Sequence, residues 1–292
     1  MCDDEFPICV AYLILAHRSP EQLLKLVQAL PKNSPIFIHF DRRADQALYD
    51  RAFALLGNRP KLEFVHRFTC RWGGIGIVEG TISAIRALVR SKMDFDYAIL
   101  LSGSDYPIKS NREIATFLQE HQGNEFIESV LLTERNRWSD QGGLFKAPHK
   151  LLGRHLRFRS RVWRLPGLRR LPAGLKPYGG SQWWCLSNVA IRYIAEFTDR
   201  TPQLLSFCRA SFIPDEAYIQ TVLSNSHLAN RVAQDDLRVI IWDRPQPPYP
   251  AILTLNDLDL LLSSTKLFAR KFDLDKYPEI YKALDDRNAS CR

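Results

Sequence analysis

The chain has 292 residues, of which 46% are hydrophobic and 25% charged, a composition typical of a water-soluble globular protein of one large or two small domains. No apolar run approaches the roughly 18 residues of a membrane-spanning helix, and the acidic start is unlike a signal peptide, so we expect a cytoplasmic protein. The six cysteines form no C-x-x-C pair, which argues against a zinc site or a disulfide framework and favours reduced, mostly buried thiols.

The net charge of +8 is concentrated in one segment. Residues 141–195 contain no Asp or Glu, and residues 146–176 hold ten Lys and Arg side chains. Without these ten, the rest of the chain carries a charge of −2. Prolines are scattered through the same segment, so we expect a basic arm inserted around 141–177 rather than a core element.

Short apolar strands alternate with amphipathic helices in the first third of the chain. We expect the first helix to begin with Ser19 as its N-cap and Pro20 at its first position. The alternation predicts βαβ units and a mainly parallel sheet. The fourth strand is apolar throughout, which is typical of a strand buried on both faces. The predicted strands are 8–16, 36–40, 62–65 and 97–101.

Polar residues follow the ends of these strands, where open α/β sheets bind their ligands. After the fourth strand the chain breaks into a Ser-Gly-Ser-Asp loop, and we expect Pro107 to end regular pairing. The alternative is a tight turn in which Asp105 caps the next helix. The residues expected at this edge are His17, Arg18, Asp41, Trp72 and 102–105.

Two features of the second half have a structural and a functional interpretation each. The aromatic pair Trp183 and Trp184 follows two glycines and fits either a sugar-binding floor or a buried strand. Residues 214–216, Pro-Asp-Glu, are also a plain start signal for a helix at 217–223.

The last part of the chain predicts a strand at 239–243 and a helix at 256–262. An adjacent pair of cations, Arg270 and Lys271, then stands between two phenylalanines, which would anchor the segment while the cations project. The chain has no G-x-G-x-x-G after its first strand, no P-loop and no Asp-x-Asp at a strand end. A metal–diphosphate clamp is therefore not evident in the sequence.

Taken together, these stretches resemble the core-2/I-branching N-acetylglucosaminyltransferase and peptide O-xylosyltransferase family. The runs appear in the family's order and cover nearly the whole chain, so the ordered set is specific although each run alone is weak. The family's eukaryotic members carry a membrane anchor and a cysteine framework. Neither is recognised in this sequence, so the chain looks like a bacterial-type catalytic core. The matching runs are residues 16–18, 38–43, 72–74, 100–108, 179–184, 214–216 and 268–273.

The resemblance implies a glycosyltransferase A-type (Rossmann-like) α/β fold with a mixed, mainly parallel sheet flanked by helices. It implies inverting transfer of N-acetylglucosamine or xylose from a UDP-sugar to an acceptor hydroxyl, giving a β linkage. No metal or other cofactor is implied, because basic side chains replace the divalent ion at the diphosphate. Glu216 is implied as the general base, and Arg270 with Lys271 as the groups that stabilise the leaving UDP.

The resemblance also implies further contacts. Gln182 stands where xylosyltransferases carry an acid, which leaves the donor sugar open. Some branching enzymes place their base just before the Gly-Ser of this segment, but residues 174–178 have no carboxylate, which favours Glu216. The implied donor-binding residues are Leu15, His17, Asp41, Trp72, Ser104, Asp105 and Tyr249. The implied acceptor or sugar contacts are Gln182, Trp183 and Asp215.

We expect one glycosyltransferase domain over 1–292, with a nucleotide-binding half at 1–130 and an acceptor-side half with the diphosphate-binding segment at 131–292. The alternative is a nucleic-acid-binding protein that uses the basic arm at 146–176, in which Arg157, Arg159 and Arg161, together with Phe158 and Trp163, would follow a phosphate backbone. Nucleic acid is the less favoured partner. The arm also fits an anionic inner-membrane surface or an acidic glycan acceptor. A catalytically inactive carbohydrate-binding module is the third class.

Overall fold

A computed structural model describes residues 8–134, 147–158, 161–242 and 250–290. Its centre is a sheet of six strands in the order β3-β2-β1-β4-β11-β6, of which the first four are parallel and β11 runs antiparallel to both neighbours. The expected fold class, a mixed and mainly parallel α/β sheet flanked by helices, is confirmed. The strands are β1 (Val10–Ala16), β2 (Ile36–Phe40), β3 (Leu62–Phe64), β4 (Tyr97–Ser102), β11 (Trp184–Ser187) and β6 (Phe126–Ile127).

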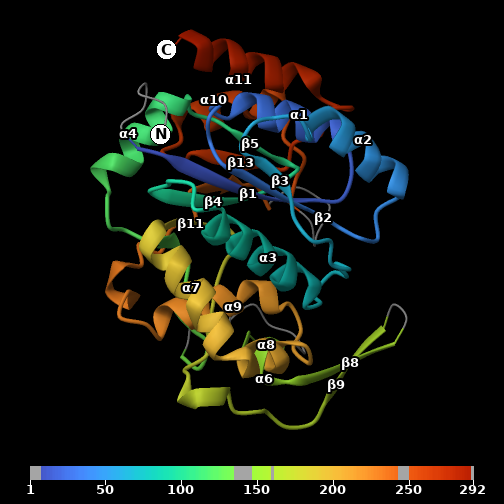
Figure 1. The fold of residues 1–292 in the computed structure, drawn as a ribbon, viewed down its shortest axis with the longest axis vertical. Coiled ribbons are helices and arrows are strands. Elements are labelled where there is room, and N and C mark those ends of the chain that lie inside the picture. Colours follow the sequence, from blue (N-terminus) through green and yellow to red (C-terminus); the bar gives the residue numbers. More distant parts are fainter. Residues whose placement is uncertain (1–7, 135–146, 159–160, 243–249, 291–292) are drawn as a thin grey trace.

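Helices cover both faces of this sheet (Figure 1). On one face lie α1 (Pro20–Ala29), α2 (Gln46–Leu56), α4 (Asn111–Glu120), α10 (Leu258–Ser263) and α11 (Pro278–Ser290). On the other lie α3 (Gly76–Ser91), α7 (Asn188–Arg200), α8 (Pro202–Cys208) and α9 (Tyr218–Ser224). Successive β1 residues alternate between the two hydrophobic cores, with Tyr12 in one and Leu13 in the other. A strand buried on both faces in this way reads as an unbroken apolar run.

A second sheet joins segments that are far apart in the sequence. It has the order β12-β13-β5, with β12 (Arg238–Ile240), β13 (Phe268–Arg270) and β5 (Asp105–Pro107). The expectation that Pro107 ends regular pairing is therefore wrong, because Pro107 lies in a strand opposite Phe268. Since β5 is an edge strand, the missing N–H of proline faces no second neighbour. The shorter β12 also replaces the strand predicted at 239–243, and position 243 is outside the described residues.

Helix starts differ from the predictions at four places. Ser19 precedes α1 in the left-handed region (φ 48°), and its side chain makes no cap hydrogen bond. The cap of α4 is Ser110 in a capping box with Glu113, so the alternative that Asp105 caps this helix is wrong. Residues 214–216 form a separate 3-10 turn, since Ala217 (φ −143°) interrupts the path into α9. The helix predicted at 256–262 likewise divides into a 3-10 turn, Leu255–Asp257, and α10.

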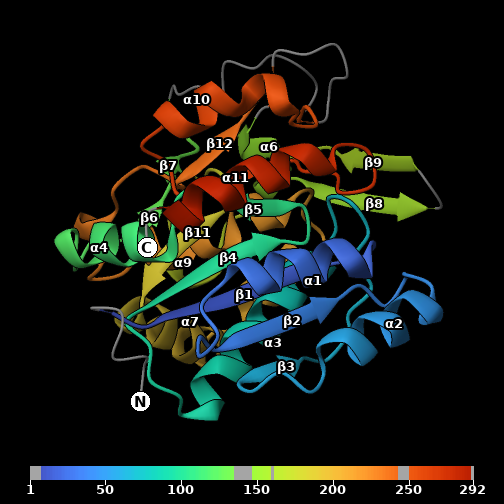
Figure 2. The ribbon, with the colours of Figure 1, turned by 90° about the horizontal axis from the view of Figure 1, so that it is seen from above.

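The basic segment consists of an extended hairpin and of flanking residues that pack into the hydrophobic core. A hairpin of β8 (Arg154–Phe158) and β9 (Arg161–Leu165) extends from the α6 side of the molecule (Figures 1 and 2). The segments on either side of the hairpin belong to the hydrophobic core, because the leucines at 151, 152 and 171 are buried in the same core as Leu13. The prediction of an arm outside the core is therefore wrong for α6 (Ala147–Leu152) and right for the hairpin. Beyond it, β10 (Tyr178–Gly179) pairs with β7 (Val130–Leu131).

Arg169 fastens these flanking residues to the rest of the fold. Its guanidinium donates five hydrogen bonds of 2.8 to 3.4 Å, and its charge lies over the Phe207 ring at 3.7 Å. The acceptors are the carbonyls of Leu151, Leu152, Gly153 and Phe207 and the hydroxyl of Ser211.

We expect Arg169→Ala to lower the free energy of unfolding by about 3 kcal/mol, because it leaves several carbonyls without a partner. Urea denaturation followed by circular dichroism measures this. The neighbouring Arg170 is exposed, and Arg170→Ala is expected to change stability by less than about 0.5 kcal/mol. Equal effects of the two substitutions would contradict the role of Arg169.

The cysteines in the described part of the chain are reduced and mostly buried, as the sequence predicts. Cys9, Cys185 and Cys208 are buried and Cys70 is half-buried, and none of these four forms a disulfide. Burial raises the pKa of Cys208 to about 12, so this thiol is not reactive at neutral pH. None of the helices in the described ranges combines the length and hydropathy needed to cross a membrane. The division into halves at 1–130 and 131–292 stays a prediction.

Candidate active site

A pocket of about 110 Å³ opens at the carboxyl ends of β1, β4 and β13. The loops after β1 and β4 meet there because the parallel strands of βαβ units end at the same edge, and the pairing of β13 with β5 brings Arg270 and Lys271 beside them. The pocket's ionisable side chains are all basic. It is lined by His17, Arg18, Ser19, Gln22, Ser102, Gly103, Ser104, Arg270 and Lys271.

The sequence led us to expect that Arg270 projects into solvent, and this prediction is wrong. Its side chain is only 12% exposed, its Nε lies 3.1 Å from Oδ1 of the fully buried Asp105, and its guanidinium lies 4.0 Å from the Trp183 ring centroid. The strand pairing of β13 with β5 sets this up, because it places Arg270 directly opposite Asp105. A buried charge needs such partners, so the pairing fixes the guanidinium at the pocket wall.

Lys271 and His17 complete the electrostatics of the pocket. Partial burial, together with the charges of Arg270 and Arg18, lowers the pKa of Lys271 to about 8. Burial and Arg18 also lower the pKa of His17, which leaves that imidazole neutral at pH 7. At pH 7 the lining of the pocket therefore carries the cations Arg18, Arg270 and Lys271, of which Arg270 is paired with the buried Asp105, and this lining attracts an anionic ligand.

The floor of the pocket is braced by hydrogen bonds. The Leu15 carbonyl accepts from the N–H of Gly103 at 2.9 Å, and the carbonyl of the buried Ser104 accepts from Phe272 at 2.9 Å. The Gln22 side-chain amide donates to the carbonyls of Gly103 at 2.7 Å and Phe272 at 3.1 Å. Gln22 was not predicted as a site residue; a polar residue on the buried face of α1 was the available signal.

Neither Asp41 nor Trp72 is among the residues that line the pocket, although the N–H of Asp41 donates to the carbonyl of Ala16, next to His17, at 2.8 Å. Oδ1 of Asp41 accepts the backbone N–H groups of Arg43 at 2.9 Å and Cys70 at 3.0 Å, which fixes the loop that carries Trp72. The Trp72 ring is 63% exposed and packs edge-on against Phe212 at 5.3 Å. Next to it, the carbonyl of Gly73 accepts from the N–H of residue 213 at 2.9 Å, so this loop is bound to the turn at 214–216.

The two carboxylates of that turn have raised pKa values. Oδ1 of Asp215 is buried with no hydrogen-bond partner among the described residues, and burial followed by repulsion from Glu216 raises the pKa of Asp215 to about 7. Burial also raises the pKa of Glu216, although its side chain remains 30% exposed. The Lys150 ammonium, 3.5 Å from Oε2 of Glu216, acts in the opposite direction.

A short segment links the carboxylates to the cations. The N–H of Gly180 donates to the backbone carbonyl of Glu216 at 2.8 Å, and a Cβ at Gly180 would lie 2.0 Å from the carbonyl oxygen of Glu128, so only glycine fits. Three residues later, Trp183 lies under the Arg270 guanidinium. Three residues of extended chain span at most about 11 Å, so Gly180, bonded to the Glu216 backbone, and Trp183, under the Arg270 guanidinium, lie no further apart than that.

The remaining predicted residues have simple outcomes. Trp184 is fully buried in β11, which confirms the buried-strand interpretation for it, whereas Trp183 is buried at the site itself. Gln182 precedes Trp183 and is half-buried. Tyr249 lies outside the described residues. Lys150 was missed, because one lysine in a basic segment carries no sequence signal.

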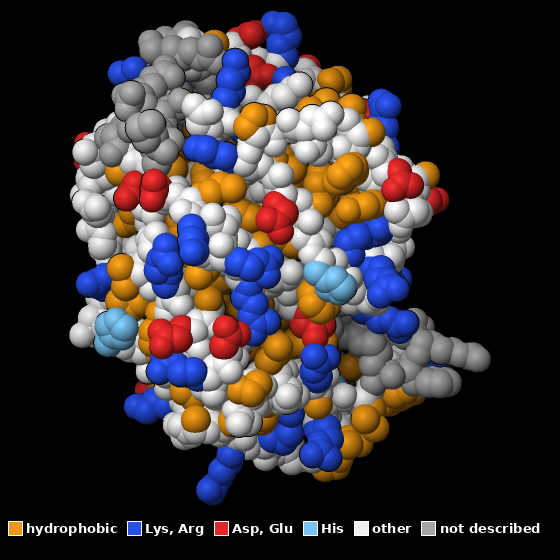
Figure 3. Space-filling view, viewed as in Figure 1, with side chains coloured by type: hydrophobic (Ala, Val, Ile, Leu, Met, Phe, Trp, Pro, Cys, Tyr) orange, Lys and Arg blue, Asp and Glu red, His pale blue; other side chains and the backbone are white. Residues whose placement is uncertain are grey.

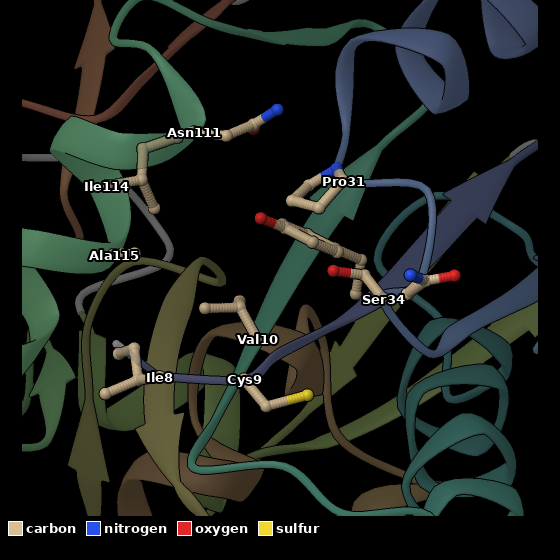
Figure 4. Close-up of a pocket in the computed structure, with 10 residues that line it drawn as sticks. Ile8, Cys9, Val10, Pro31, Ser34, Asn111, Ile114 and Ala115 are labelled. Atoms are coloured by element: carbon tan, nitrogen blue, oxygen red, sulfur yellow. The ribbon is translucent and has the colours of Figure 1, made fainter. Parts of the chain in front are cut away.

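A second cavity lies at the opposite end of β1, where β1 begins, between Val10, Pro31, Ser34 and Asn111 (Figure 4). Its volume of about 20 Å³ is close to that of one water molecule, so it does not compete as a substrate site. Within the described ranges, no group of three or more His, Cys, Asp or Glu side chains is arranged to hold a metal ion.

A parallel sheet with a cationic pocket at its carboxyl edge and carboxylates beside it defines an α/β protein built to bind an anionic ligand. The chain belongs to the core-2/I-branching enzyme family, a family of glycosyltransferases, because the model of that family matches residues 10–261. The family resemblance read from the sequence is confirmed.

The chain is also similar to two curated relatives, and one solved structure aligns with it weakly. The chain is 29% identical to xylosyltransferase 2 of Homo sapiens over 96% of this chain and 33% of that protein. It is 29% identical to xylosyltransferase oxt of Drosophila melanogaster over 81% of this chain and 27% of that protein. The chain thus spans about a third of the length of these relatives. The inositol-1-phosphate CTP transferase of T. maritima aligns over 96% of both chains with 9% identity and a TM-score of 0.38.

Proposed function

We propose that the protein is an inverting glycosyltransferase of the A-type fold that moves a sugar from a UDP-sugar to an acceptor hydroxyl without a metal ion. The sugar is N-acetylglucosamine or xylose, and the product is a β-glycoside. The observation that carries the proposal is the cationic pocket joined, through residues 180–183, to two carboxylates of raised pKa. One part fits a leaving diphosphate and the other a proton acceptor.

In this proposal the donor occupies the carboxyl edge of the sheet. Arg270 and Lys271 take the diphosphate and stabilise the charge that develops as the bond to the sugar breaks. Leu15, His17 and Asp41 hold the uridine. Ser104 and Asp105 shape the floor, Trp72 closes the pocket beside the sugar, and Tyr249 is a further donor contact.

The acceptor approaches from the 214–216 turn. Glu216 takes the proton of the attacking hydroxyl, which inversion requires on the face opposite the leaving UDP. Lys150 keeps part of the Glu216 population ionised, because its charge opposes the effect of burial. Gln182, Trp183 and Asp215 contact the sugar or the acceptor. Asp215, with a pKa of about 7, is partly protonated at neutral pH and can donate a hydrogen bond.

Two measurements in excess chelator test this function: calorimetric titration with UDP, UDP-xylose and UDP-N-acetylglucosamine, and an assay of turnover of the two sugar nucleotides. We expect UDP to bind in chelator, and one of the two sugar nucleotides to support transfer at a rate that added Mn²⁺ changes by less than about twofold. The reason is that the fixed cations already neutralise the diphosphate. A strict Mn²⁺ requirement would contradict the metal-independent mechanism, and UDP binding without turnover of any UDP-sugar would point to a binding module.

A further inference from the structure

The hairpin β8–β9 has two chemically different faces. Leu156 pairs with Trp163 and His155 with Arg164, and directly paired residues of antiparallel strands share a face. His155 turns inward, is buried, and packs on Phe212 at 5.6 Å. Since side chains alternate along a strand, Leu156 and Trp163 occupy the outer face.

The outer face is apolar at its centre. Leu156 is 53% and Trp163 is 47% exposed, and they lie opposite each other across the two strands. Leu168, which follows the hairpin, is 51% exposed. Single exposed apolar residues are ordinary, but a cross-strand Leu–Trp pair that none of the described elements covers places apolar surface where it can meet a partner.

Basic residues flank this apolar pair. Arg154 and Arg161 are exposed and share the outer face by the same alternation. No acidic residue occurs between 141 and 195 to neutralise them. In Figure 3, basic and apolar side chains lie together at the lower right of the molecule, where Figure 1 places the hairpin.

We propose that the outer face of β8–β9 docks the protein on an anionic lipid surface. Arginines attract the negative headgroups, the Trp163 ring occupies the headgroup level and Leu156 enters the acyl boundary. A polyanion such as nucleic acid would satisfy the arginines but leave Leu156 in water. The proposal is independent of sugar transfer.

Docking in this way would hold the candidate active site beside the membrane. His155 on the inner face contacts Phe212, and Phe212 contacts Trp72, the proposed donor contact. The backbone N–H of Phe212 also donates to the carbonyl of Lys150, whose side chain reaches Glu216. An acceptor carried by the lipid surface would then need no long approach to the carboxylates.

Cosedimentation with vesicles tests the charge contribution. We expect binding to mixed phosphatidylcholine–phosphatidylglycerol vesicles, no binding to phosphatidylcholine alone, and weaker binding as salt increases. Arg161→Glu is expected to weaken binding about tenfold. Arg112→Glu makes the same charge change on α4, away from the hairpin, and is expected to change binding less than twofold. Equal effects of the two reversals would overturn the proposal.

A second matched pair of substitutions tests the apolar contribution to vesicle binding. We expect Leu156→Ser to weaken vesicle binding about fivefold and Leu260→Ser, an equally exposed leucine on α10, to leave it unchanged. Brominated phosphatidylglycerol is expected to quench tryptophan fluorescence in the wild type, and Trp163→Phe to remove that quenching. Tight binding to a random oligonucleotide with no vesicle binding would overturn lipid docking in favour of nucleic acid.

Discussion

We expect Glu216→Gln to lower the rate of sugar transfer by about a thousandfold while UDP affinity changes less than about threefold. The amide keeps the shape of the side chain but cannot accept a proton, and removal of a general base costs about 10² to 10⁴ in rate. Glu216 does not line the cationic pocket proposed for the donor, so we expect donor binding to be left intact. Turnover from a UDP-sugar and calorimetry with UDP measure the two effects separately.

A nearby carboxylate supplies the control for this substitution. Glu128 is close enough to raise the pKa of Glu216, but it is not part of the proposed machinery. Glu128→Gln is expected to keep the rate within about threefold of the wild type. A Glu216→Gln variant that turns over like Glu128→Gln would remove Glu216 from the role of base.

The Lys150–Glu216 contact adds a pH dependence with a defined sign. Glu216 must be ionised to act, so activity falls as the pH drops through its pKa. Lys150 lowers that pKa, so Lys150→Met is expected to raise it and to move the acid limb of the kcat profile to higher pH, whereas Lys150→Arg retains the charge. An unmoved acid limb in Lys150→Met would show that the lysine does not tune the base.

Local patterns in the sequence predicted the central sheet well. The run at residues 36–40 appears with unchanged bounds as β2, because continuous apolar character is what burial on both faces demands. The polar residues after β1 and β4 meet at the pocket for the same reason: parallel connections leave no other edge for them. The pattern of apolar residues and the direction of the strands are therefore enough to predict these parts of the site.

What the sequence could not predict depends on contacts between distant segments. The pairing of Asp105 with Arg270 spans more than half of the chain and converts an expected projecting cation into a buried one. Lys150 and Gln22 are ordinary residues until the fold brings them to Glu216 and to the pocket floor. Ser19 has the right chemistry for a cap, but its backbone adopts a left-handed conformation instead.

Lys271→Met is expected to weaken UDP binding by about 10- to 100-fold and to abolish its pH dependence between pH 7 and 9. A charge-assisted contact with a phosphate contributes about 1.5 to 3 kcal/mol, which corresponds to this range. Because the pKa of Lys271 is about 8, the ammonium is charged below that pH and neutral above it. Wild-type affinity for UDP should therefore fall as the pH rises through about 8.

Lys271→Arg separates charge from size, because a guanidinium stays protonated throughout this range. We expect this variant to bind UDP within about threefold of the wild type at pH 7 and to keep its affinity at pH 9. His17 does not interfere, since its lowered pKa leaves it neutral from pH 7 upward. Calorimetry at pH 7, 8 and 9 on the three proteins decides the matter: equal pH dependence in the wild type and in Lys271→Met would mean that residue 271 is not at the diphosphate.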